Sequence, residues 1–253
     1  MTADSSELLS AAFDEGALSQ GSGRALAEVT SEIDQALGEL AERAETLLVS
    51  VLADDTASIG AIRKRAQAVI NGHNRMITAA ERRSGETTVL FHTRLIAGGT
   101  VSPYRNISRA VPLSWENYSP DARQTPLHQQ SIVMLGSVLA KARQLQAYGC
   151  QVRTFTLILT DGADNGGSFL ASDVRLLTTD MLDFSHDHII AGMGIGEEPL
   201  FRRIFGEMGI SRVLTADSSD SDIDREFQRI ERALELAAAS QTAFRELMAG
   251  SGL

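Results

Sequence analysis

Hydrophobic and polar positions follow two patterns along the chain. Short apolar runs, typical of strands buried on both faces, occupy residues 46–55, 151–162, 186–196 and 211–218. Between these runs, apolar residues recur every three or four positions, which predicts amphipathic helices over 58–83, 125–149, 168–184 and 197–209, and from residue 219 nearly to the end. Strands that alternate with helices of this length indicate βαβ units.

The fold class predicted from this order is α/β, with a doubly wound, mostly parallel central sheet that has helices on both faces, as in Rossmann-like folds. The runs 87–93 and 94–102 have only a short connection, so we expect an antiparallel pair with one strand at the sheet edge. We divide the chain into a flexible N-terminal segment, a helical extension and one α/β domain that includes the long C-terminal helix. Their ranges are 1–23, 24–44 and 45–253.

Composition narrows the function classes. The net charge of −10 argues against a nucleic-acid binder, because such proteins carry basic patches. Cys150 is the only cysteine, so an internal disulfide and a cysteine-based zinc site are excluded. The acidic N-terminus lacks a secretory signal pattern, and no apolar run approaches the roughly 20 residues that span a bilayer. We therefore expect a cytoplasmic protein without membrane insertion.

Oxygen-bearing side chains gather where predicted strands end. Asp54, Thr56 and Ser58 follow the first strand in the sequence VLADDTASIG, and Asp161 follows a later strand in LILTDG. Thr125 stands at the start of a predicted helix in QTPLH. Ligands of open α/β sheets bind at the carboxyl ends of the strands, so these five side chains can meet at one edge.

Carboxylate and hydroxyl oxygens without nearby sulfur suit a hard cation. We expect Mg²⁺, with Mn²⁺ or Ca²⁺ as alternatives, because oxygen ligands alone do not separate the three ions. In an extended segment alternate residues point the same way, so Asp54, Thr56 and Ser58 can face one ion while Asp55 faces away, as a helix cap or a solvent-exposed residue. Taken alone, the stretch 54–58 reads equally well as a helix N-cap.

The three motifs together resemble the von Willebrand factor A (vWA) domain with its metal-ion-dependent adhesion site (MIDAS). That family's D-x-[ST]-x-S motif is matched by 54–58, its threonine before a helix by Thr125, and its T-D-G aspartate by Asp161, in the family's order. The sequence departs from the family pattern at Thr56, which is more often serine, at Ile59, which is usually methionine, and at 121–124, where glycines are common. By resemblance, Asp54, Ser58 and either Thr125 or Thr56 contact the ion directly or through water, and Asp161 is a second carboxylate.

The resemblance implies a divalent-cation-dependent protein-binding module of the bacterial cytoplasmic type. An Asp or Glu of a partner protein would complete the ion's coordination. By analogy, that partner is an AAA+ ATPase or a co-operonic protein in a multiprotein stress or defence assembly. No cofactor other than the cation and no catalytic residue is expected.

Two alternatives remain open at this point. One is a metal-dependent hydrolase or phosphatase that uses the Asp54 and Asp161 cation site, with His128 as the candidate general base. The other is a scaffold in which the terminal helices bind the partner. We favour the interpretation that these helices pack on the domain. Trp115 and Tyr118, in the loop before Thr125, are expected to anchor that loop or to contact a partner.

Overall fold

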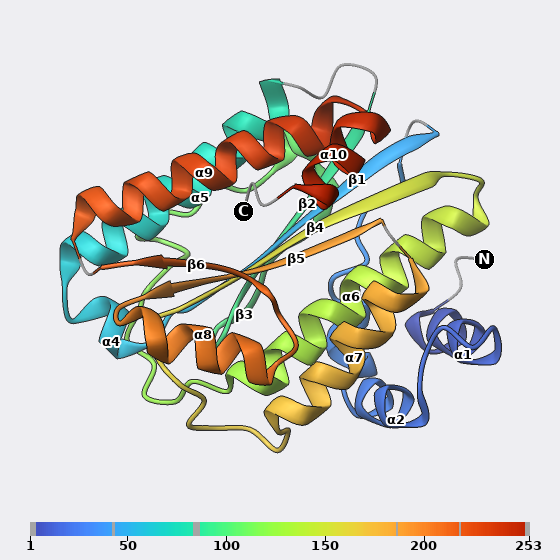
Figure 1. Cartoon of the computed structure of the whole chain (residues 1–253), viewed down its shortest axis with the longest axis horizontal. Helices are drawn as coiled ribbons and strands as arrows, with labels where there is room; N and C mark the ends of the chain where they lie inside the picture. The colour runs from blue at the N-terminus through green and yellow to red at the C-terminus, as the bar shows by residue number, and fades with distance from the viewer. Residues whose placement is uncertain (1–3, 42–43, 83–86, 186, 218, 251–253) are drawn as a thin grey trace.

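A six-stranded sheet of order β3-β2-β1-β4-β5-β6 forms the centre of the molecule (Figure 1). The computed structural model describes residues 4–41, 44–82, 87–185, 187–217 and 219–250. The strands are β1 (Glu45–Ala53), β2 (Thr88–Leu95), β3 (Gly99–Asn106), β4 (Gln151–Thr160), β5 (His188–Ile195) and β6 (Arg212–Ala216). Neighbouring strands are parallel except β2 and β3, which are antiparallel. The predicted α/β, mostly parallel sheet with one antiparallel edge strand is confirmed.

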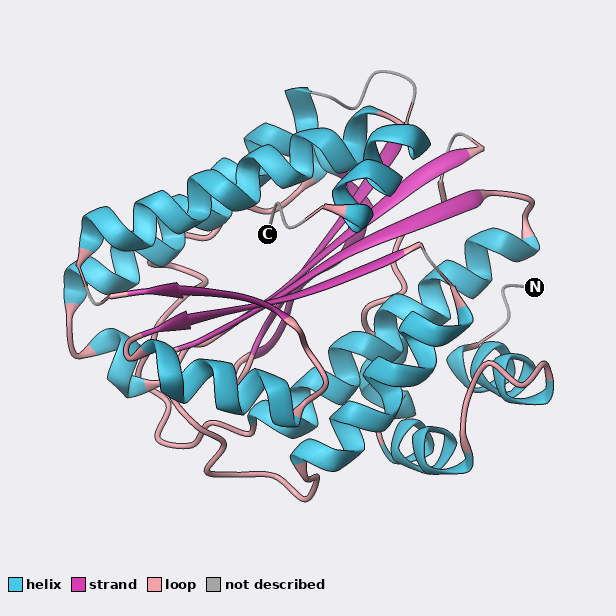
Figure 2. Ribbon diagram, in the orientation of Figure 1, coloured by secondary structure: helices cyan, strands magenta, loops and turns pink. Residues whose placement is uncertain are grey.

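Helices cover both faces of this sheet (Figure 2). One face carries α5 (Arg63–Arg82), α9 (Asp220–Ala239) and α10 (Gln241–Ala249). The other carries α6 (Leu127–Ala147), α7 (Ala171–Phe184) and α8 (Glu198–Glu207), with α1 (Ser5–Asp14), α2 (Gln20–Glu28) and α3 (Thr30–Asp34) outside them. Two short pieces, α4 (Ala57–Gly60) and the 3₁₀ helix η1 (Ile107–Arg109), complete the elements. The sheet therefore lies between two helical layers.

Side chains alternate along the strands, so each strand contributes to a hydrophobic core on each face of the sheet. In β5, Ile189, Ala191, Met193 and Ile195 face the layer of α5 and α9. On the opposite face, Gly192 and Gly194 leave room for two rings of α8, because an added Cβ would lie 2.5 Å from Phe205 and 2.0 Å from Phe201. Both phenylalanines are fully buried, and each such side chain contributes roughly 1.5–3 kcal/mol to stability.

The N-terminal part of the chain differs from the prediction. In the range 1–23, expected to be weakly structured, the chain forms α1 and the start of α2, and the side chains of Asp4 and Ser19 cap these helices. In the range 24–41 of the expected helical extension 24–44, the chain forms the rest of α2 and the separate helix α3, and it is not helical over 35–41; residues 42–43 lie outside the described residues. Leu26 and Ile33 pack against α6 at Gly136, where an added Cβ would lie 2.5–2.6 Å from them. Apolar contact of this kind orders short helices that would be marginal alone. The division of the chain into three parts remains a prediction.

The C-terminal helix is interrupted once. Helix α9 ends at Ala239, and Ser240 adopts an extended backbone whose side chain caps α10 by accepting from the Ala243 N–H at 3.1 Å. Phe244 of α10 is fully buried in the core shared with α5 and α9. Both terminal helical segments thus pack on the domain, as we favoured.

The edge hairpin has later boundaries than the sequence predicted. Its turn lies at 96–98, and β3 continues through Pro103 to Asn106, beyond the predicted end at residue 102. Proline is tolerated here because β3 is an edge strand, where one side of the backbone needs no ladder hydrogen bond.

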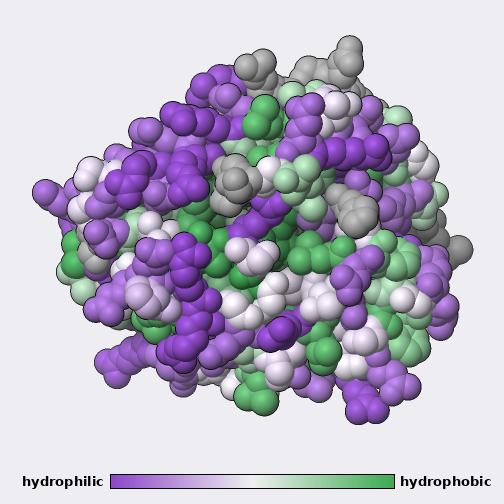
Figure 3. Space-filling model, viewed as in Figure 1, coloured by the Kyte–Doolittle hydropathy of each residue, from purple (hydrophilic) through white to green (hydrophobic). Residues whose placement is uncertain are grey.

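The molecular surface on the face drawn in Figure 3 is mixed. Hydrophilic residues cover the outer side of α9, and hydrophobic residues gather in the hollow between α9 and α8 (Figure 3). Among the helices that the structure describes, none combines the length and the apolar character needed to span a bilayer.

Candidate cation site

The site lies where the order of the strands reverses. Helical connections lead from β1 to β2 on one side and from β4 to β5 on the other, so the carboxyl ends of β1 and β4 form the topological switch point. The two strands are parallel and in register, with Ala53 beside Leu159. The backbone N–H of Asp54 continues this ladder to the Leu159 carbonyl at 3.0 Å. Asp54 and Asp161 therefore leave the sheet side by side.

Asp54 is fully buried and accepts hydrogen bonds on both carboxylate oxygens. Its Oδ1 accepts from the Thr56 N–H at 2.9 Å and from Thr56 Oγ1 at 2.6 Å. Its Oδ2 accepts from Thr160 Oγ1 at 2.7 Å and, at 3.4 Å, from the Asp161 N–H. The carboxylate is thereby fixed between the first loop and the end of β4.

Ser58 connects the first loop to Asp161. The Ser58 hydroxyl donates to Asp161 Oδ1 at 2.7 Å and lies 3.0 Å from Thr56 Oγ1. Asp161 Oδ2 accepts from the guanidinium of Arg65 at 2.8 Å. Burial raises the pKa of Asp161, as does the charge of Asp54, while the bonds from Ser58 and Arg65 act in the opposite direction.

Thr125 is held between the loops that carry the other four residues. Its backbone N–H donates to Asn165 Oδ1 at 2.5 Å, and its carbonyl accepts from the Asn165 N–H at 3.1 Å. On the other side, Ala122, three residues before Thr125, forms a β-bridge with Thr56 of the first loop. Thr125 is buried and precedes α6, as predicted. The structure thus joins Asp54, Thr56, Ser58 and Asp161 directly through their side chains. Thr125 bonds through its backbone to Asn165, in the loop that follows Asp161, and not to the other four residues.

Asp55 faces away from this cluster, but it is neither a helix cap nor solvent-exposed. Its side chain is buried, and its two oxygens accept from the N–H groups of Ala97 (2.7 Å) and Gly98 (2.8 Å) in the β2–β3 turn. Burial raises the pKa of this carboxyl group. Asp55 is buried because the neighbouring strand β2 ends beside β1, and the turn after β2 presents two backbone donors to its carboxylate.

Tyr118 anchors the long loop before Thr125. Its ring is fully buried, and its hydroxyl donates to the Asp54 carbonyl at 2.6 Å. Trp115 instead remains 42% exposed, with Arg63 over its ring at 5.0 Å and its Nε1 donating to Gln67 at 2.9 Å. The two aromatic residues therefore differ: one is an internal anchor and the other lies on the surface near the site.

The donor set fits a hard cation. Within a few ångströms the chain places two carboxylates and the hydroxyls of Thr56 and Ser58, all oxygen ligands of the type that Mg²⁺ and Mn²⁺ accept. Among the described residues there is no group of three or more His, Cys, Asp and Glu side chains arranged for a metal. The described residues therefore contain no metal site built on three such side chains, and this cluster instead supplies oxygens from two carboxylates and two hydroxyls.

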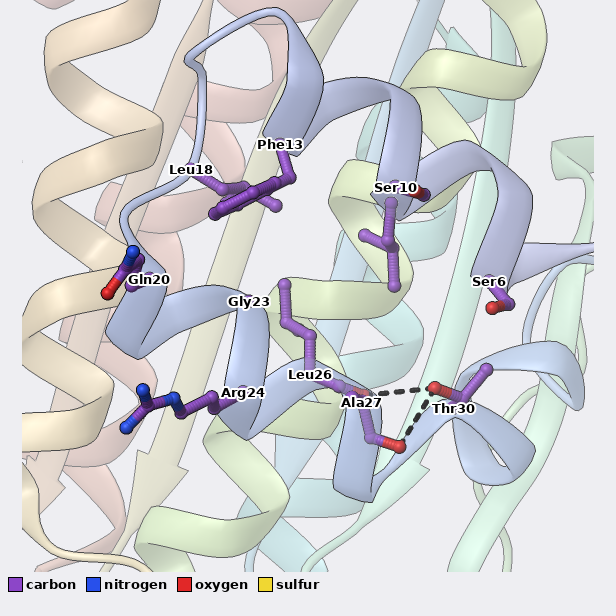
Figure 4. A pocket seen from close by; sticks show the side chains of 11 residues that line it. Ser6, Ser10, Phe13, Leu18, Gln20, Gly23, Arg24, Leu26, Ala27 and Thr30 are labelled. Carbon is purple, nitrogen blue, oxygen red and sulfur yellow. Dashed lines mark hydrogen bonds between the residues drawn. The ribbon is translucent and has the colours of Figure 1, made fainter.

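Two cavities flank the cluster along residues that adjoin it in sequence, and neither is lined by any of the five site residues. One, of about 640 Å³, lies between the β2–β3 turn and the loop 111–122 and is lined in part by Asp55, Asn117 and Asp121. The second, of about 560 Å³, is lined by Ala97 and by residues 122–124 and 126. A third cavity, also of about 560 Å³, lies apart from them among α1, α2 and the segment between them (Figure 4). Its lining residues come from the N-terminal helices, far along the sequence from the five site residues.

Comparison with known proteins finds similarity at the level of structure. Neither a scan of protein families nor a search of curated proteins gives a match. Among solved structures, the pilus adhesin SpaC from Lactobacillus rhamnosus GG aligns at a TM-score of 0.50 with 13% identity, over 78% of this chain and 31% of that chain. At this identity the likeness concerns the fold alone. A von Willebrand factor type A protein from Catenulispora acidiphila aligns at 0.46 with 11% identity, over 80% and 48% of the two chains.

Proximal thread matrix protein 1 from the mussel byssus aligns at a TM-score of 0.48 with 15% identity, over 80% of this chain and 50% of that chain. The chain thus spans about half the length of this protein and of the Catenulispora protein. Another structure of the mussel protein has zinc in its MIDAS motif and aligns at 0.42, with 16% identity over 77% and 46% of the chains. At such identities the likeness to vWA domains concerns the fold.

Sequence reasoning missed Thr160 and Arg65, and it gave Tyr118 only as a loop anchor or a partner contact. Thr160 and Asn165 lie beside the predicted Asp161 and bond to Asp54 and Thr125. Tyr118 comes from a loop without periodicity. Arg65 belongs to a helix that reads as an ordinary amphipathic helix, yet its first turn holds three consecutive cations, and that signal was available in the sequence.

Proposed function

We propose that this chain is a divalent-cation-dependent protein-binding module with a MIDAS-type site. The observation that carries the proposal is the hydrogen-bonded cluster of Asp54, Thr56, Ser58 and Asp161 at the topological switch point. Asp54, Ser58 and either Thr56 or Thr125 would hold the ion directly or through water, with Asp161 as a second carboxylate. Mg²⁺ is the proposed ion, and Mn²⁺ and Ca²⁺ are the alternatives.

The ion would serve recognition because few protein groups hold it. A partly satisfied hard cation accepts a further oxygen ligand, and an Asp or Glu of a partner protein supplies one with opposite charge. The two flanking cavities support this proposal, because they give a partner concave surface on the side of Asp55 and on the side of Gln124. An AAA+ ATPase as partner, and a cytoplasmic location, belong to the same proposal.

We propose binding in preference to catalysis. His128, the candidate general base, lies at the start of α6 with its Nδ1 3.7 Å from Asp164 Oδ2, and its backbone N–H donates to Asp164 Oδ1 at 3.0 Å. These contacts tie His128 to Asp164 and support a structural role for His128. No other observation favours a hydrolase.

The test has two steps. Titration calorimetry with MgCl₂ and MnCl₂ measures cation binding by the wild-type chain and by Asp54→Asn and Ser58→Ala. Saturating cation at 100 times Kd should stabilise the wild-type fold by about 2.7 kcal/mol. For a chain of this size each kcal/mol raises Tm by about 2–4 °C. Affinity capture from the source cell, with Mg²⁺ or with EDTA, then reveals whether a partner depends on the ion. Absence of cation binding by the wild-type chain contradicts the proposal.

A further inference from the structure

The first turn of α5 breaks a local rule of helix stability. Arg63, Lys64 and Arg65 stand in sequence at the helix N-terminus, and that turn holds no acidic residue. The positive end of the helix dipole lies there, so each cation is unfavourable by a few tenths of a kcal/mol. Such local conflicts concentrate at functional sites. Arg63 lies over the Trp115 ring and Lys64 is exposed, which leaves Arg65 as the residue directed at the cation site.

Arg65 contacts both sides of that site. Its Nη1 donates to Asp161 Oδ2 at 2.8 Å and to the Ser58 carbonyl at 3.3 Å. The side chain of Arg65 is 12% exposed and that of Asp161 is 2% exposed. Water therefore screens this pair far less than it screens an ion pair on the surface. Within the described residues, Arg65 Nε is buried and lacks a hydrogen-bond acceptor, so the guanidinium is held there by its contact with the site.

We propose that Arg65 is a built-in counter-ion that lowers the affinity of this site for divalent cations. The inference rests on the proposed function, because it concerns the same site. The positive charge of the guanidinium offsets one of the two carboxylate charges that would attract the ion. A divalent cation near Asp161 is repelled by it and competes with it for the carboxylate. The site without metal is correspondingly stabilised, because its buried carboxylates have a positive partner.

Three substitutions separate this role from others. Arg65→Gln keeps a hydrogen-bond donor and removes the charge. Arg65→Lys keeps the charge. Lys64→Gln removes an equal charge from the same helical turn at an exposed position, which controls for the general effect of net charge. Binding of MnCl₂ by all four chains is measured by titration calorimetry, and Tm is measured in EDTA and in saturating MnCl₂.

Arg65→Gln should bind Mn²⁺ about tenfold more tightly than the wild type. The corresponding gain in binding free energy is a modest fraction of the interaction energy between two unit charges at an effective dielectric constant near 20. Arg65→Lys and Lys64→Gln should stay within about threefold of the wild type, a small change on the scale of 1.4 kcal/mol per factor of ten. In EDTA, Arg65→Gln should melt below the wild type, and saturating Mn²⁺ should close most of that gap.

Each other result overturns the inference in an identifiable way. Equal Mn²⁺ affinities for wild type and Arg65→Gln would refute it and leave the proposed cation site intact. An equal gain in Lys64→Gln would assign the effect to net charge. If the difference in Tm between wild type and Arg65→Gln is the same in EDTA and in Mn²⁺, Arg65 is a purely structural residue. Failure of every chain to bind Mn²⁺ would overturn both this inference and the proposed function.

Discussion

Replacing Tyr118 by phenylalanine tests how the long loop before α6 is fixed to the site. The substitution keeps the buried ring and removes the hydroxyl that donates to the Asp54 carbonyl at 2.6 Å. The carbonyl belongs to the residue whose side chain organises the site, so the lost bond loosens the loop and the end of β1 together. Burial and the charges of Asp54, Asp55 and Asp161 raise the pKa of Tyr118, which keeps the hydroxyl protonated across the neutral range.

The expected cost follows from the burial of both partners. Leaving a buried acceptor without its donor costs about 1–3 kcal/mol, and we take about 2 kcal/mol for this neutral bond. For a chain of this length the corresponding fall in Tm is about 4–8 °C. The loss should be the same at pH 6 and pH 9, because the donor remains protonated at both.

Urea denaturation and thermal melting of Tyr118→Phe measure this cost. Tyr148→Phe is the matched control, because Tyr148 is 58% exposed and its hydroxyl loss should change Tm by less than about 1 °C, as for surface substitutions generally. Hydrogen exchange of residues 113–121 should also accelerate in Tyr118→Phe. A urea midpoint equal to that of the wild type would show that the loop is anchored by its packing and would refute the argument from the hydrogen bond.

Three further predictions concern the surroundings of the site. Gly72→Ala should destabilise the fold by about 1–3 kcal/mol through overpacking, because the new Cβ would lie 2.2–2.4 Å from the buried Phe227 ring. In urea denaturation, adding Phe227→Leu should recover part of this loss. If the effects of the two substitutions simply add, the overpacking argument is contradicted. Asp55→Ala should cost about 1–3 kcal/mol by leaving two turn N–H groups unpaired, whereas a neutral result would mean that water replaces the carboxylate. Burial lowers the pKa of His73 from 6.5 to about 4. Between pH 4 and pH 6.5 the unfolded chain therefore binds more protons than the folded chain, so stability falls as the pH drops through this range. His73→Gln should flatten that part of the stability profile, measured by urea midpoints at pH 4–7, and an unchanged slope would refute the assignment.

Much of the fold and part of the site follow from local sequence patterns. Buried strands that end in Asp54 and Asp161 could be recognised because apolar runs and the acids after them lie within a few residues of each other. Parallel pairing then brings the two strand ends together regardless of loop detail. The roles of Thr56, Ser58, Thr125 and the two aspartates as metal ligands remain predictions, although the structure gathers them at one edge.

The remaining contacts depend on geometry that no local pattern encodes. Asp55 finds its donors in a turn more than 40 residues later, and Arg65 reaches Asp161 only through the angle at which α5 leaves the edge of the sheet. Tyr118 comes from a segment with neither helical nor strand periodicity, so its burial depends on tertiary packing alone. Order in 5–23 was missed for the same reason, because the short helices there are stabilised by contacts with α6 and α7.

The adjacency of β1 and β4 has a consequence for how such a site can diversify. Neighbouring strands lie about 4.8 Å apart, and that spacing is set by the backbone ladder. The two aspartates therefore start from backbone positions that no side-chain substitution can shift without breaking the sheet. Ser58, Thr125 and Arg65 sit on loops or on a helix end, where change is tolerated. Evolution or engineering can consequently change the surroundings of the two carboxylates from the periphery, with the pair itself as an invariant reference point.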